Sequence, residues 1–396
     1  MKIAIVGGGP SGLYCATLVK KRHPEWLVSV IEQNAADATF GFGVVLGDAG
    51  LSQIREADAP IHGQLIAKMT FNRRQHIVQR ETPVLINHPT SGGAIARIDL
   101  LSILQSAALD AGVDVRFGTR IEHPDDLARH SLADADVIIG ADGVNSVVRT
   151  AFEPQFGTTR SSLSNHFAWF GTSKVFATSA LVFRRHKGGA FVAHYYPYCA
   201  TGSTFVAECD HATWTALGMD RMSGDQCKSL FEEVFAPELD GHPLMSNNSA
   251  WRQFPVIRNL RWNAGRHVLI GDAQTSAHFS IGSGTRIAME DAIALADALT
   301  AGHDDTLTAG HDDASVASRL QHFADTRGPQ KDKLIGASER SYLWYERIDE
   351  WIDRYTPHEF IYAFMKRTGR MTDERLAAQY PELFELIRPD ARRQNA

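Results

Sequence analysis

Residues 2–12 have the sequence KIAIVGGGPSG, and this stretch decides the fold of the chain. A short apolar run followed at once by closely spaced glycines predicts a strand, a tight turn and the start of a helix. Gly7 allows the turn, Gly9 lets the backbone approach a pyrophosphate, and Gly12 lets the helix pack close to the strand. The amino end of that helix offers unpaired N–H groups and a positive dipole to phosphates. We therefore expect a dinucleotide to bind at this turn.

The residues that follow complete the dinucleotide-binding pattern. Residues 13–22 predict a helix that His23-Pro24 ends, and residues 27–31 predict a second strand. Glu32 ends that strand about 20 residues after the last glycine, where a carboxylate can accept hydrogen bonds from a ribose diol. Because a carboxylate repels a 2′-phosphate, we expect FAD or NAD rather than NADP at this turn. The nucleotide contacts predicted in this unit are Gly7, Gly9, Pro10, Ser11, Gly12, Glu32 and Gln33.

Two later strand patterns also end in glycine and aspartate. Residues 136–149, DVIIGADGVNSVVR, contain one of them, and residues 266–273, RHVLIGDA, contain the other. Ligands bind at the carboxyl ends of parallel strands, so we expect Asp142 near a ribose or pyrophosphate and Asp272 near a ribityl hydroxyl. Residues 280–285, SIGSGT, precede a predicted helix whose start can stabilise negative charge on a reduced flavin ring. The contacts predicted here are Asp142, Gly143, Gly271, Asp272, Gly282, Ser283, Gly284 and Thr285.

The rest of the chain alternates between sheet and helix patterns. Residues 63–90 and 160–210 alternate apolar with polar residues or are rich in β-branched and aromatic ones, and both predict antiparallel strands. Residues 97–109 predict a helix and residues 113–117 predict a strand. From residue 319 onward the pattern is helical and charged.

The bulk composition is that of an ordinary globular protein. With 396 residues the chain is long enough for two or three domains, and a formal net charge of −6 argues against binding nucleic acid. The strand expected from Lys2 leaves no room for a signal peptide, and no stretch is apolar enough to span a bilayer, so we expect a cytoplasmic protein without a membrane partner. The four cysteines lack CxxC or zinc spacing and are expected to be free thiols. The segment TAGHDD at residues 300–305 recurs at 308–313; we interpret it as a duplicated surface loop and predict no metal site.

Taken together, the three motifs resemble those of the class A FAD-dependent aromatic monooxygenases, the para-hydroxybenzoate hydroxylase type. Residues 7–12 are similar to the ADP motif of that family, residues 140–149 to the motif that contacts FAD and NAD(P)H, and residues 271–284 to the ribityl and isoalloxazine motif. The resemblance implies an α/β fold, in which a Rossmann-like FAD-binding domain of the GR2 type is interleaved with an antiparallel β-sheet substrate domain and followed by C-terminal helices. The expected boundaries are 1–70, 93–160 and 255–320 for the FAD-binding domain, 71–92 and 161–254 for the substrate domain, and 321–396 for the C-terminal helices.

A narrower resemblance concerns four shorter segments. Residues 41–45, 169–172, 203–209 and 277–285 are similar to the branch that contains salicylyl-CoA 5-hydroxylase and 2-aminobenzoyl-CoA monooxygenase. The resemblance implies that O2 and NADH or NADPH are co-substrates, and that a flavin C4a-hydroperoxide hydroxylates the ring of an aromatic acyl-CoA thioester such as salicylyl-CoA. The alternatives are a hydroxylase of a free indole- or tryptophan-type aromatic compound, and a flavin dehydrogenase that inserts no oxygen. The sequence is compatible with a monomer or a homodimer.

Several side chains are candidates for the chemistry of the substrate. A phenol or aniline ring needs a polar partner, for which His278 is the first candidate and His194 with Tyr195 the second. The alternative for His278 is a structural hydrogen bond. The resemblance places Arg97 beside the flavin, and the basic run at residues 184–187 is expected to meet either a CoA phosphate or solvent. The predicted substrate contacts are Val45, Trp169, Tyr195, Phe205, Phe279, Arg184 and Arg185.

Overall fold

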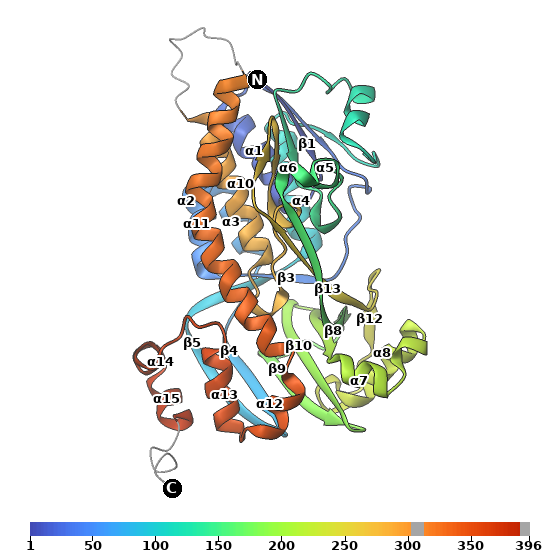
Figure 1. Cartoon of the computed structure of the whole chain (residues 1–396). Coiled ribbons are helices and arrows are strands. Elements are labelled where there is room, and N and C mark those ends of the chain that lie inside the picture. Colours follow the sequence, from blue (N-terminus) through green and yellow to red (C-terminus); the bar gives the residue numbers. More distant parts are fainter. Residues whose placement is uncertain (302–312, 389–396) are drawn as a thin grey trace.

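The chain folds into two lobes that a long helix joins along one side (Figure 1). The computed structural model describes residues 1–301 and 313–388. One lobe contains the amino terminus and is built on a six-stranded, mostly parallel sheet, whereas the other is built on a nine-stranded, mostly antiparallel sheet. The expected α/β fold with an antiparallel β domain and C-terminal helices is confirmed.

The six-stranded sheet has the strand order β14–β15–β7–β1–β2–β6. All neighbouring pairs are parallel except β14 with β15. Val6 lies opposite Ile31 on one side and Gly140 on the other, and Gly140 lies opposite Leu269. The strands that precede the three motifs therefore end at the same edge of the sheet, as ligand-binding strands do. The strands are β1 (Lys2–Val6), β2 (Leu27–Ile31), β6 (Asp114–Arg116), β7 (Val137–Gly140), β14 (Asn263–Ala264) and β15 (His267–Leu269).

Helices cover this sheet and complete the first hydrophobic core. Leu13 and Val19 of α1 are buried in one cluster with Leu104 of α4 and Leu295 of α10. The apolar faces of these helices therefore pack on the strands and on one another. The helices of this lobe are α1 (Pro10–Arg22), α2 (Asp48–Ala57), α3 (Ala59–Lys68), α4 (Arg97–Asp110), α5 (Val147–Ala151), α6 (Glu153–Phe156) and α10 (Gly284–Thr300).

One segment that the sequence pattern assigned to a strand is helical. Residues 63–68, which we expected to form part of the antiparallel strands, are the end of α3. The Asp58 side chain accepts a hydrogen bond from Ile61 N–H at the amino end of this helix, and Ile61 and Leu65, one turn apart, are both buried. A local cap and a helical spacing of apolar residues thus outweigh the alternation that suggested a strand. The antiparallel hairpin begins only at Thr70.

The nine-stranded sheet has the order β12–β8–β11–β10–β9–β4–β5–β3, and β13 also pairs with β8. Only the pair of β4 and β9 is parallel. This sheet includes β3 and parts of β5 and β13, which lie in ranges that we expected to belong to the FAD-binding domain. The strands are β3 (Gly43–Leu46), β4 (Thr70–Gln79), β5 (Thr82–Ala96), β8 (Thr158–Thr172), β9 (Ser179–His186), β10 (Gly189–Cys199), β11 (Gly202–Cys209), β12 (Leu244–Ser246) and β13 (Arg252–Asn259).

Different helices cover the two faces of the nine-stranded sheet. Along β10, Phe191 faces one side and packs near Phe231 of α8, whereas Val192 faces the other and packs near Phe360 of α13. The candidate active site lies on the second of these faces. The helices of this lobe are α7 (His211–Ala216), α8 (Gly224–Val234), α9 (Ala236–Leu239), α12 (Ile348–Arg354), α13 (Pro357–Lys366), α14 (Asp373–Gln379) and α15 (Pro381–Ile387).

The long helix α11 (Asp313–Tyr345) contributes to the cores of both lobes. Leu320 and Phe323 are buried in the first core, and Tyr345 is buried in the core of the large sheet. The helical pattern expected from residue 319 onward is confirmed as far as residue 387, whereas most of the repeated TAGHDD segment lies outside the described residues. The four cysteines are unpaired, as predicted. Within the described ranges, none of the helices combines the length and hydropathy that crossing a lipid bilayer requires.

Candidate active site

Close backbone contacts hold the glycine turn that follows β1. Gly7 has a φ of +109°, and a Cβ there would lie 2.4 Å from Ala141 O. A Cβ at Gly12 would lie 2.1 Å from Gly7 O, so α1 approaches the turn only because both positions are glycine. Gly9 differs, because a Cβ there would meet nothing within 4 Å. The turn is therefore closed at Gly7 and Gly12 and open at Gly9, the position where we expect a pyrophosphate.

Glu32 lies directly beside the glycine turn. Its Oε2 accepts a hydrogen bond from Gly8 N–H at 2.7 Å, and its Oε1 accepts one from Asn34 N–H at 2.8 Å. The carboxylate therefore braces the turn. Oε1 also accepts from Asn34 Nδ2 at 2.6 Å, whereas Oε2 keeps a lone pair that can accept from a ribose hydroxyl. That contact with ribose stays a prediction. Gln33, the neighbouring predicted contact, is exposed.

Arg149 links the second motif to the third. Its buried guanidinium donates to Ala273 O at 2.9 Å and also to Val144 O. Asp142 shapes the same turn by accepting from Val147 N–H at 2.7 Å, and burial raises the pKa of its carboxyl. The other oxygen of Asp142 is buried and finds no partner among the described residues. These bonds fix the turn between β7 and α5 next to the end of β15.

Gly271 and Asp272 place the third motif at the same edge of the sheet. Gly271 has a φ of +60°, its N–H donates to Asp291 Oδ2 at 3.0 Å, and a Cβ there would lie 2.8 Å from Ser11 Oγ. Asp272 is accessible to solvent but surrounded by protein, and this enclosure raises the pKa of its carboxyl. Burial lowers the pKa of Arg97, at the start of α4, and the charge of Asp272 opposes that shift. A carboxylate and a half-buried cation therefore share one interior space beside the three motifs.

Two helices present uncapped amino ends in this region. α1 follows Gly9 and α10 follows Ser283, and neither residue caps its helix with a side chain. The first N–H groups of both helices are therefore available to an anion or to a carbonyl group of a ligand. Together with the open side of Gly9 and the enclosed carboxylate of Asp272, these ends suit the pyrophosphate, the flavin ring and the ribityl chain of FAD. The residues present fit this cofactor.

His278 is bonded into the turn that precedes α10. Its Nδ1 accepts a hydrogen bond from Ser280 N–H at 3.2 Å, and its own N–H donates to Ser338 Oγ at 3.1 Å. Burial, with a smaller electrostatic contribution from His194, lowers the pKa of His278 to about 3. A ring that is neutral at physiological pH and already bonded at Nδ1 is a poor proton acceptor. These contacts favour the structural alternative for His278 over the catalytic role that we considered first.

His194 forms a buried pair with Glu208. The distance from His194 Nε2 to Glu208 Oε2 is 3.0 Å, and Glu208 Oε1 accepts from Asn165 Nδ2 at 3.0 Å. Because the carboxylate accepts the proton of Nε2, Nδ1 is the unprotonated nitrogen of the ring. Nδ1 makes no hydrogen bond within the described residues, so its lone pair is free. An imidazole oriented by a carboxylate is the arrangement of a general base.

Aromatic rings surround this pair on the side of the flavin motif. Phe279, just before the glycines of the third motif, has its ring centroid 5.4 Å from that of His194. The centroids of Phe167 and Trp169, on β8, lie 4.8 and 5.7 Å from that of Phe279. These rings therefore connect the large sheet with the loop of the third motif. Such an apolar surface can keep water away from a reacting ring.

Two residues of this site are not among the catalytic and substrate contacts that we predicted from the sequence. Glu208 pairs with His194, and the Tyr196 hydroxyl donates to Gly43 O at 2.9 Å. Strand alternation is the signal that could have identified both. Tyr196 is two residues after His194 on β10 and faces the same side. Glu208 is two residues after Val206, which lies opposite His194 on β11.

The same alternation turns Tyr195 and Phe205 away from the flavin motifs. Tyr195 stacks on Phe176, with ring centroids 3.8 Å apart, and Phe205 is fully buried in the same core. We expected both residues at the substrate, but they belong to the opposite face of the sheet because neighbouring residues of a strand face opposite sides. Val45 is half-buried on β3, while its neighbour Val44 is part of the first core.

The basic run at residues 184–187 is neutralised by carboxylates of the protein. The Arg184 guanidinium is buried, and the Arg185 guanidinium lies against α12. These pairs join β9 to neighbouring elements, so the run stabilises the fold, and the expected contact with a CoA phosphate finds no support here. The ion pairs are Arg184 with Glu81 and Glu238, and Arg185 with Asp349 and Asp353.

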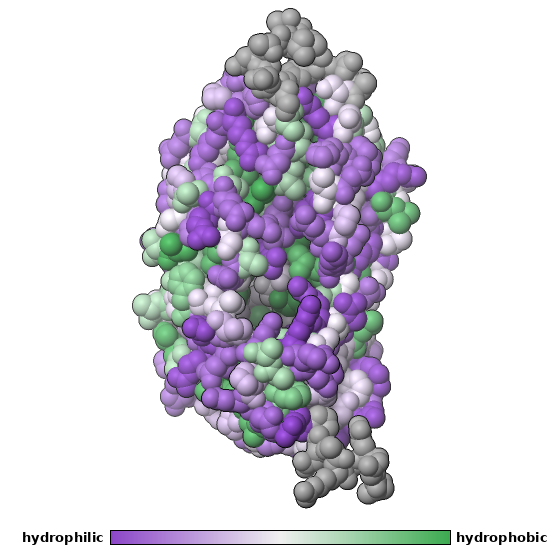
Figure 2. Space-filling view, turned by 90° about the vertical axis from the view of Figure 1, so that its left-hand side faces the viewer, coloured by the Kyte–Doolittle hydropathy of each residue, from purple (hydrophilic) through white to green (hydrophobic). Residues whose placement is uncertain are grey.

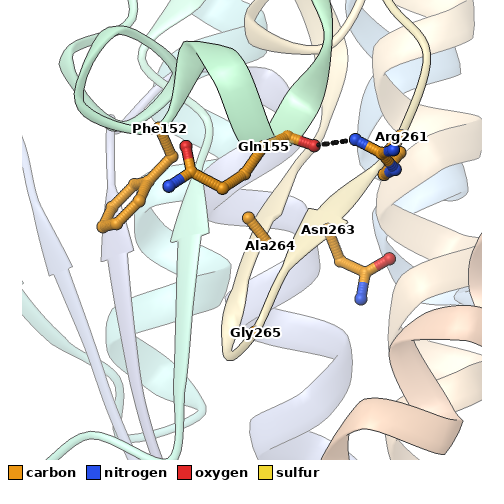
Figure 3. Close-up of a pocket in the computed structure, with 6 residues that line it drawn as sticks. All are labelled: Phe152, Gln155, Arg261, Asn263, Ala264 and Gly265. Atoms are coloured by element: carbon orange, nitrogen blue, oxygen red, sulfur yellow. Dashed lines mark hydrogen bonds between the residues drawn. The ribbon is translucent and has the colours of Figure 1, made fainter.

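A surface cleft elsewhere in the first lobe has none of these features. It has a volume of about 510 Å³ and lies between α6 and the hairpin of β14 and β15 (Figure 3). Of its lining residues only Arg261 is titratable, and that side chain donates to Gln155 O at 2.8 Å. The residues of the three motifs do not line it. The lining residues are Phe152, Gln155, Arg261, Asn263, Ala264 and Gly265.

Comparisons with known proteins agree with this geometry. A model of the FAD binding domain family matches residues 1–322. The chain is 37% identical to salicyloyl-CoA 5-hydroxylase of a Streptomyces species over 381 residues, which cover 93% of this chain and 70% of that protein. It is 32% identical to 3-hydroxy-4-methyl-anthranilyl-[aryl-carrier protein] 5-monooxygenase of Streptosporangium sibiricum over 350 residues, with coverages of 88% and 90%. A solved tetrameric form of 2-methyl-3-hydroxypyridine-5-carboxylic acid oxygenase shares the fold, with a TM-score of 0.73 and 17% identity over 93% of this chain and 95% of that one.

Proposed function

Because the chain belongs to the FAD binding domain family of flavin-dependent aromatic monooxygenases, we propose that it hydroxylates an aromatic ring that is carried as a CoA thioester. FAD is its cofactor, NADH or NADPH is the electron donor, and O2 is the second substrate. The observation that supports the proposal most directly is the His194–Glu208 pair beside an aromatic surface at the FAD motifs. The similarity to salicyloyl-CoA 5-hydroxylase favours a thioester as the form of the substrate.

The motifs at the edge of the six-stranded sheet would hold FAD. The open turn at Gly9 and the amino end of α1 receive the pyrophosphate, and Glu32 receives the ribose of the adenosine. Asp272 accepts from the ribityl chain, and the amino end of α10 beside Gly282 stabilises negative charge on the ring. When bound, FAD would supply the redox chemistry: NADH or NADPH provides two electrons, one atom of O2 enters the substrate, and the other atom leaves as water.

His194 would remove a proton from the substrate. A phenol or aniline becomes a stronger nucleophile as its proton leaves, because electron density on the ring increases. The free Nδ1 of His194 accepts that proton, and Glu208 stabilises the resulting positive charge through Nε2. Asn165 holds the other oxygen of Glu208 and fixes the carboxylate in place. The chain thus supplies the base and its orientation, and leaves the oxidation to the cofactor.

The aromatic residues would keep the reaction dry. Phe167, Trp169 and Phe279 form a continuous apolar surface between the large sheet and the third motif. Exclusion of water prevents loss of activated oxygen to the solvent before it reaches the substrate. The same surface offers ring faces on which an aromatic substrate can stack.

A substrate screen with the purified holoprotein tests the proposal. The compounds are salicylyl-CoA, 2-aminobenzoyl-CoA, their free acids and tryptophan, and the readouts are NADH or NADPH oxidation, O2 uptake and mass spectrometry. We expect a CoA thioester to stimulate oxidation and to gain one oxygen atom. If tryptophan or a free acid is hydroxylated and no thioester is, the proposed carrier is wrong. If oxidation proceeds and none of the compounds gains oxygen, the protein is a dehydrogenase and not a hydroxylase.

A further inference from the structure

A cleft of about 340 Å³ opens between α11, α14 and the loop of the third motif. Figure 2 looks onto the side of the molecule that carries α11 and α14, and shows it hollowed at mid-height. Ile281 and Ser283 of the third motif line the cleft together with Arg367, Arg370 and Arg375. One space is therefore shared by the loop of the third motif, by Arg367 and Arg370 of the turn after α13, and by Arg375 of α14.

In the part of the chain that the structure describes, these guanidiniums have no carboxylate partner. Arg367 donates to Ser341 Oγ at 3.1 Å and to Ser280 O at 3.0 Å. Arg375 Nη1 donates to Arg370 O at 2.9 Å, so its guanidinium lies against the backbone of the preceding arginine. Within residues 1–301 and 313–388, none of the three arginines takes part in an ion pair. The cleft therefore has a positive charge that this part of the chain does not neutralise.

Several arginines elsewhere in the described part of the chain are neutralised by carboxylates. Arg184, Arg185 and Arg327 each pair with two carboxylates, and the formal net charge of the chain is −6. The three arginines of the cleft therefore concentrate positive charge on a chain whose net charge is negative. A local excess of this kind attracts anionic ligands.

The turn that carries the arginines has a defined geometry. Gly369 has a φ of +69°, and a Cβ there would lie 2.7 Å from Arg340 Nε. Arg340 in turn donates from Nε to Thr368 O at 2.6 Å. Glycine is therefore needed both for the backbone conformation and for the passage of the Arg340 side chain. Packing of this kind positions the Arg367 and Arg370 backbone before a ligand arrives.

We propose that this cleft, which we call the arginine cleft, binds the phosphate groups of the carrier of the aromatic acyl group. The inference rests on the proposed thioester substrate. Guanidiniums bind phosphate oxygens through paired, charge-assisted hydrogen bonds. Ile281 lines the cleft and Phe279, two residues earlier, belongs to the aromatic surface at His194. In this proposal the pantetheine arm follows this loop from the arginines to the reacting ring.

The test compares two double variants of the holoenzyme. Arg370→Gln with Arg375→Gln removes two charges from the cleft, and Arg120→Gln with Arg129→Gln removes two exposed charges from the first lobe. For the cleft variant we expect the KM of the aryl-CoA substrate to rise about 10- to 100-fold, because each lost bond to a phosphate weakens binding. The kcat and the FAD content stay unchanged, and the control variant matches the wild type in all three quantities.

Shorter thioesters identify the phosphate that is bound. An aryl N-acetylcysteamine thioester has no phosphate, and its KM should be the same for the wild type and the cleft variant. If an aryl phosphopantetheine thioester shows the full loss, the cleft binds the phosphate of the pantetheine arm. If only the CoA thioester shows the loss, it binds the phosphates of the adenosine part. Both of these outcomes support the proposal.

Calorimetric titration with free CoA separates the inference from the proposed function. We expect the cleft variant to bind CoA at least about tenfold more weakly than the wild type. Equal CoA affinity, or a raised KM for NADH or NADPH in place of the thioester, overturns the arginine cleft while hydroxylation of thioesters stands. Failure of the wild type to hydroxylate any thioester overturns the proposed function, whatever the titration shows.

Discussion

At the scale of single residues, the His194–Glu208 pair makes the most direct prediction. Glu208→Gln replaces the carboxylate by an amide, which cannot stabilise a protonated imidazole. We expect kcat for product formation to fall about 10²- to 10⁴-fold, the usual contribution of an oriented base. The KM of the substrate and the FAD content should change little, because Glu208 is buried behind His194.

A second histidine–glutamate pair provides a matched control for this variant. His186 Nε2 lies 3.0 Å from Glu233 Oε1, but this pair is on the surface. Glu233→Gln should leave kcat unchanged. If Glu208→Gln also forms product at the rate of the wild type, the pair of His194 and Glu208 serves the fold and not the proton transfer.

His278 predicts an effect of pH on stability. Its pKa is about 3 in the folded chain, against 6.5 for an unperturbed histidine. Between these values the unfolded chain binds the additional proton, so the free energy of unfolding decreases as the pH falls below 6.5. From pH 7 to pH 5 this group alone should remove about 2 kcal/mol, at about 1.4 kcal/mol per pH unit.

Urea unfolding at pH 7 and pH 5 measures this contribution. His278→Gln keeps an acceptor for Ser280 N–H and removes the titrating ring. The variant should lose about 2 kcal/mol less than the wild type between the two pH values. The other titrating groups are common to both proteins and cancel in the comparison. An identical pH dependence of the two proteins would show that His278 is not buried as a neutral ring.

At the scale of elements, the turn between β1 and α1 separates cofactor binding from folding. A Cβ at Gly9 meets nothing within 4 Å, so Gly9→Ala should change the stability of the apoprotein by less than about 1 kcal/mol. The added methyl group would occupy the place that we propose for the pyrophosphate, so FAD affinity should fall by about tenfold or more. Gly12→Ala meets Gly7 O and should cost about 1–3 kcal/mol of stability.

Two measurements distinguish these glycine variants. Urea unfolding of the apoprotein reports stability, and titration with FAD, followed by flavin fluorescence, reports affinity. Gly9→Ala is expected to change only the affinity for FAD, whereas Gly12→Ala is expected to change both the stability and the affinity. Normal FAD affinity of Gly9→Ala would place the pyrophosphate elsewhere.

The buried ion cluster between α10 and α11 connects the third motif to the fold. Asp291 accepts from Arg327 Nε at 2.8 Å and from Lys331 Nζ at 2.6 Å, and it also holds Gly271 N–H. Asp291→Asn leaves two buried cations with less compensation, which should cost about 3–5 kcal/mol of stability. Because Gly271 precedes Asp272, FAD affinity should fall as well.

An exposed aspartate of the same helix is the control for Asp291. Asp297 pairs with Arg22 at 2.7 Å, and its side chain is 58% exposed. Asp297→Asn should cost less than about 1 kcal/mol, as exposed ion pairs do. Equal effects of the two variants on urea unfolding would contradict a special role for the buried cluster.

At the scale of the whole molecule, local signals predicted the first lobe better than the second. The glycines, the helix stop and Glu32 mark β1, α1 and β2 within one short stretch, so their positions were predictable. The site on the large sheet depends on which face of β10 meets the third motif. His194 and Tyr195 are equally plausible in the sequence, and only the packing of α13 against the side of Val192 decides between them.

Contacts between distant residues account for the remaining differences. Arg184 is bound by Glu81 and Glu238, which are 103 and 54 positions away in the chain. No local pattern indicates such distant partners. The sequence therefore could not show whether the basic side chains of residues 184–187 are paired with carboxylates of the protein or are free to bind a ligand. The arginine cleft is the converse case, because Arg367 and Ile281 meet only when the C-terminal helices fold onto the third motif.

The long helix α11 predicts that the two lobes unfold together. Leu320 is fully buried in the first core, and Phe360 of α13 is fully buried in the core of the large sheet, to which Tyr345 of α11 also belongs. Leu320→Ala and Phe360→Ala should each cost about 2–5 kcal/mol. Because α11 is part of both cores, each variant should lower the midpoint of one common transition in scanning calorimetry.

Leu343→Ala, at an exposed position of α11, is the control and should leave the midpoint of this transition unchanged. Two separate transitions, each lowered by only one variant, would mean that α11 does not couple the lobes.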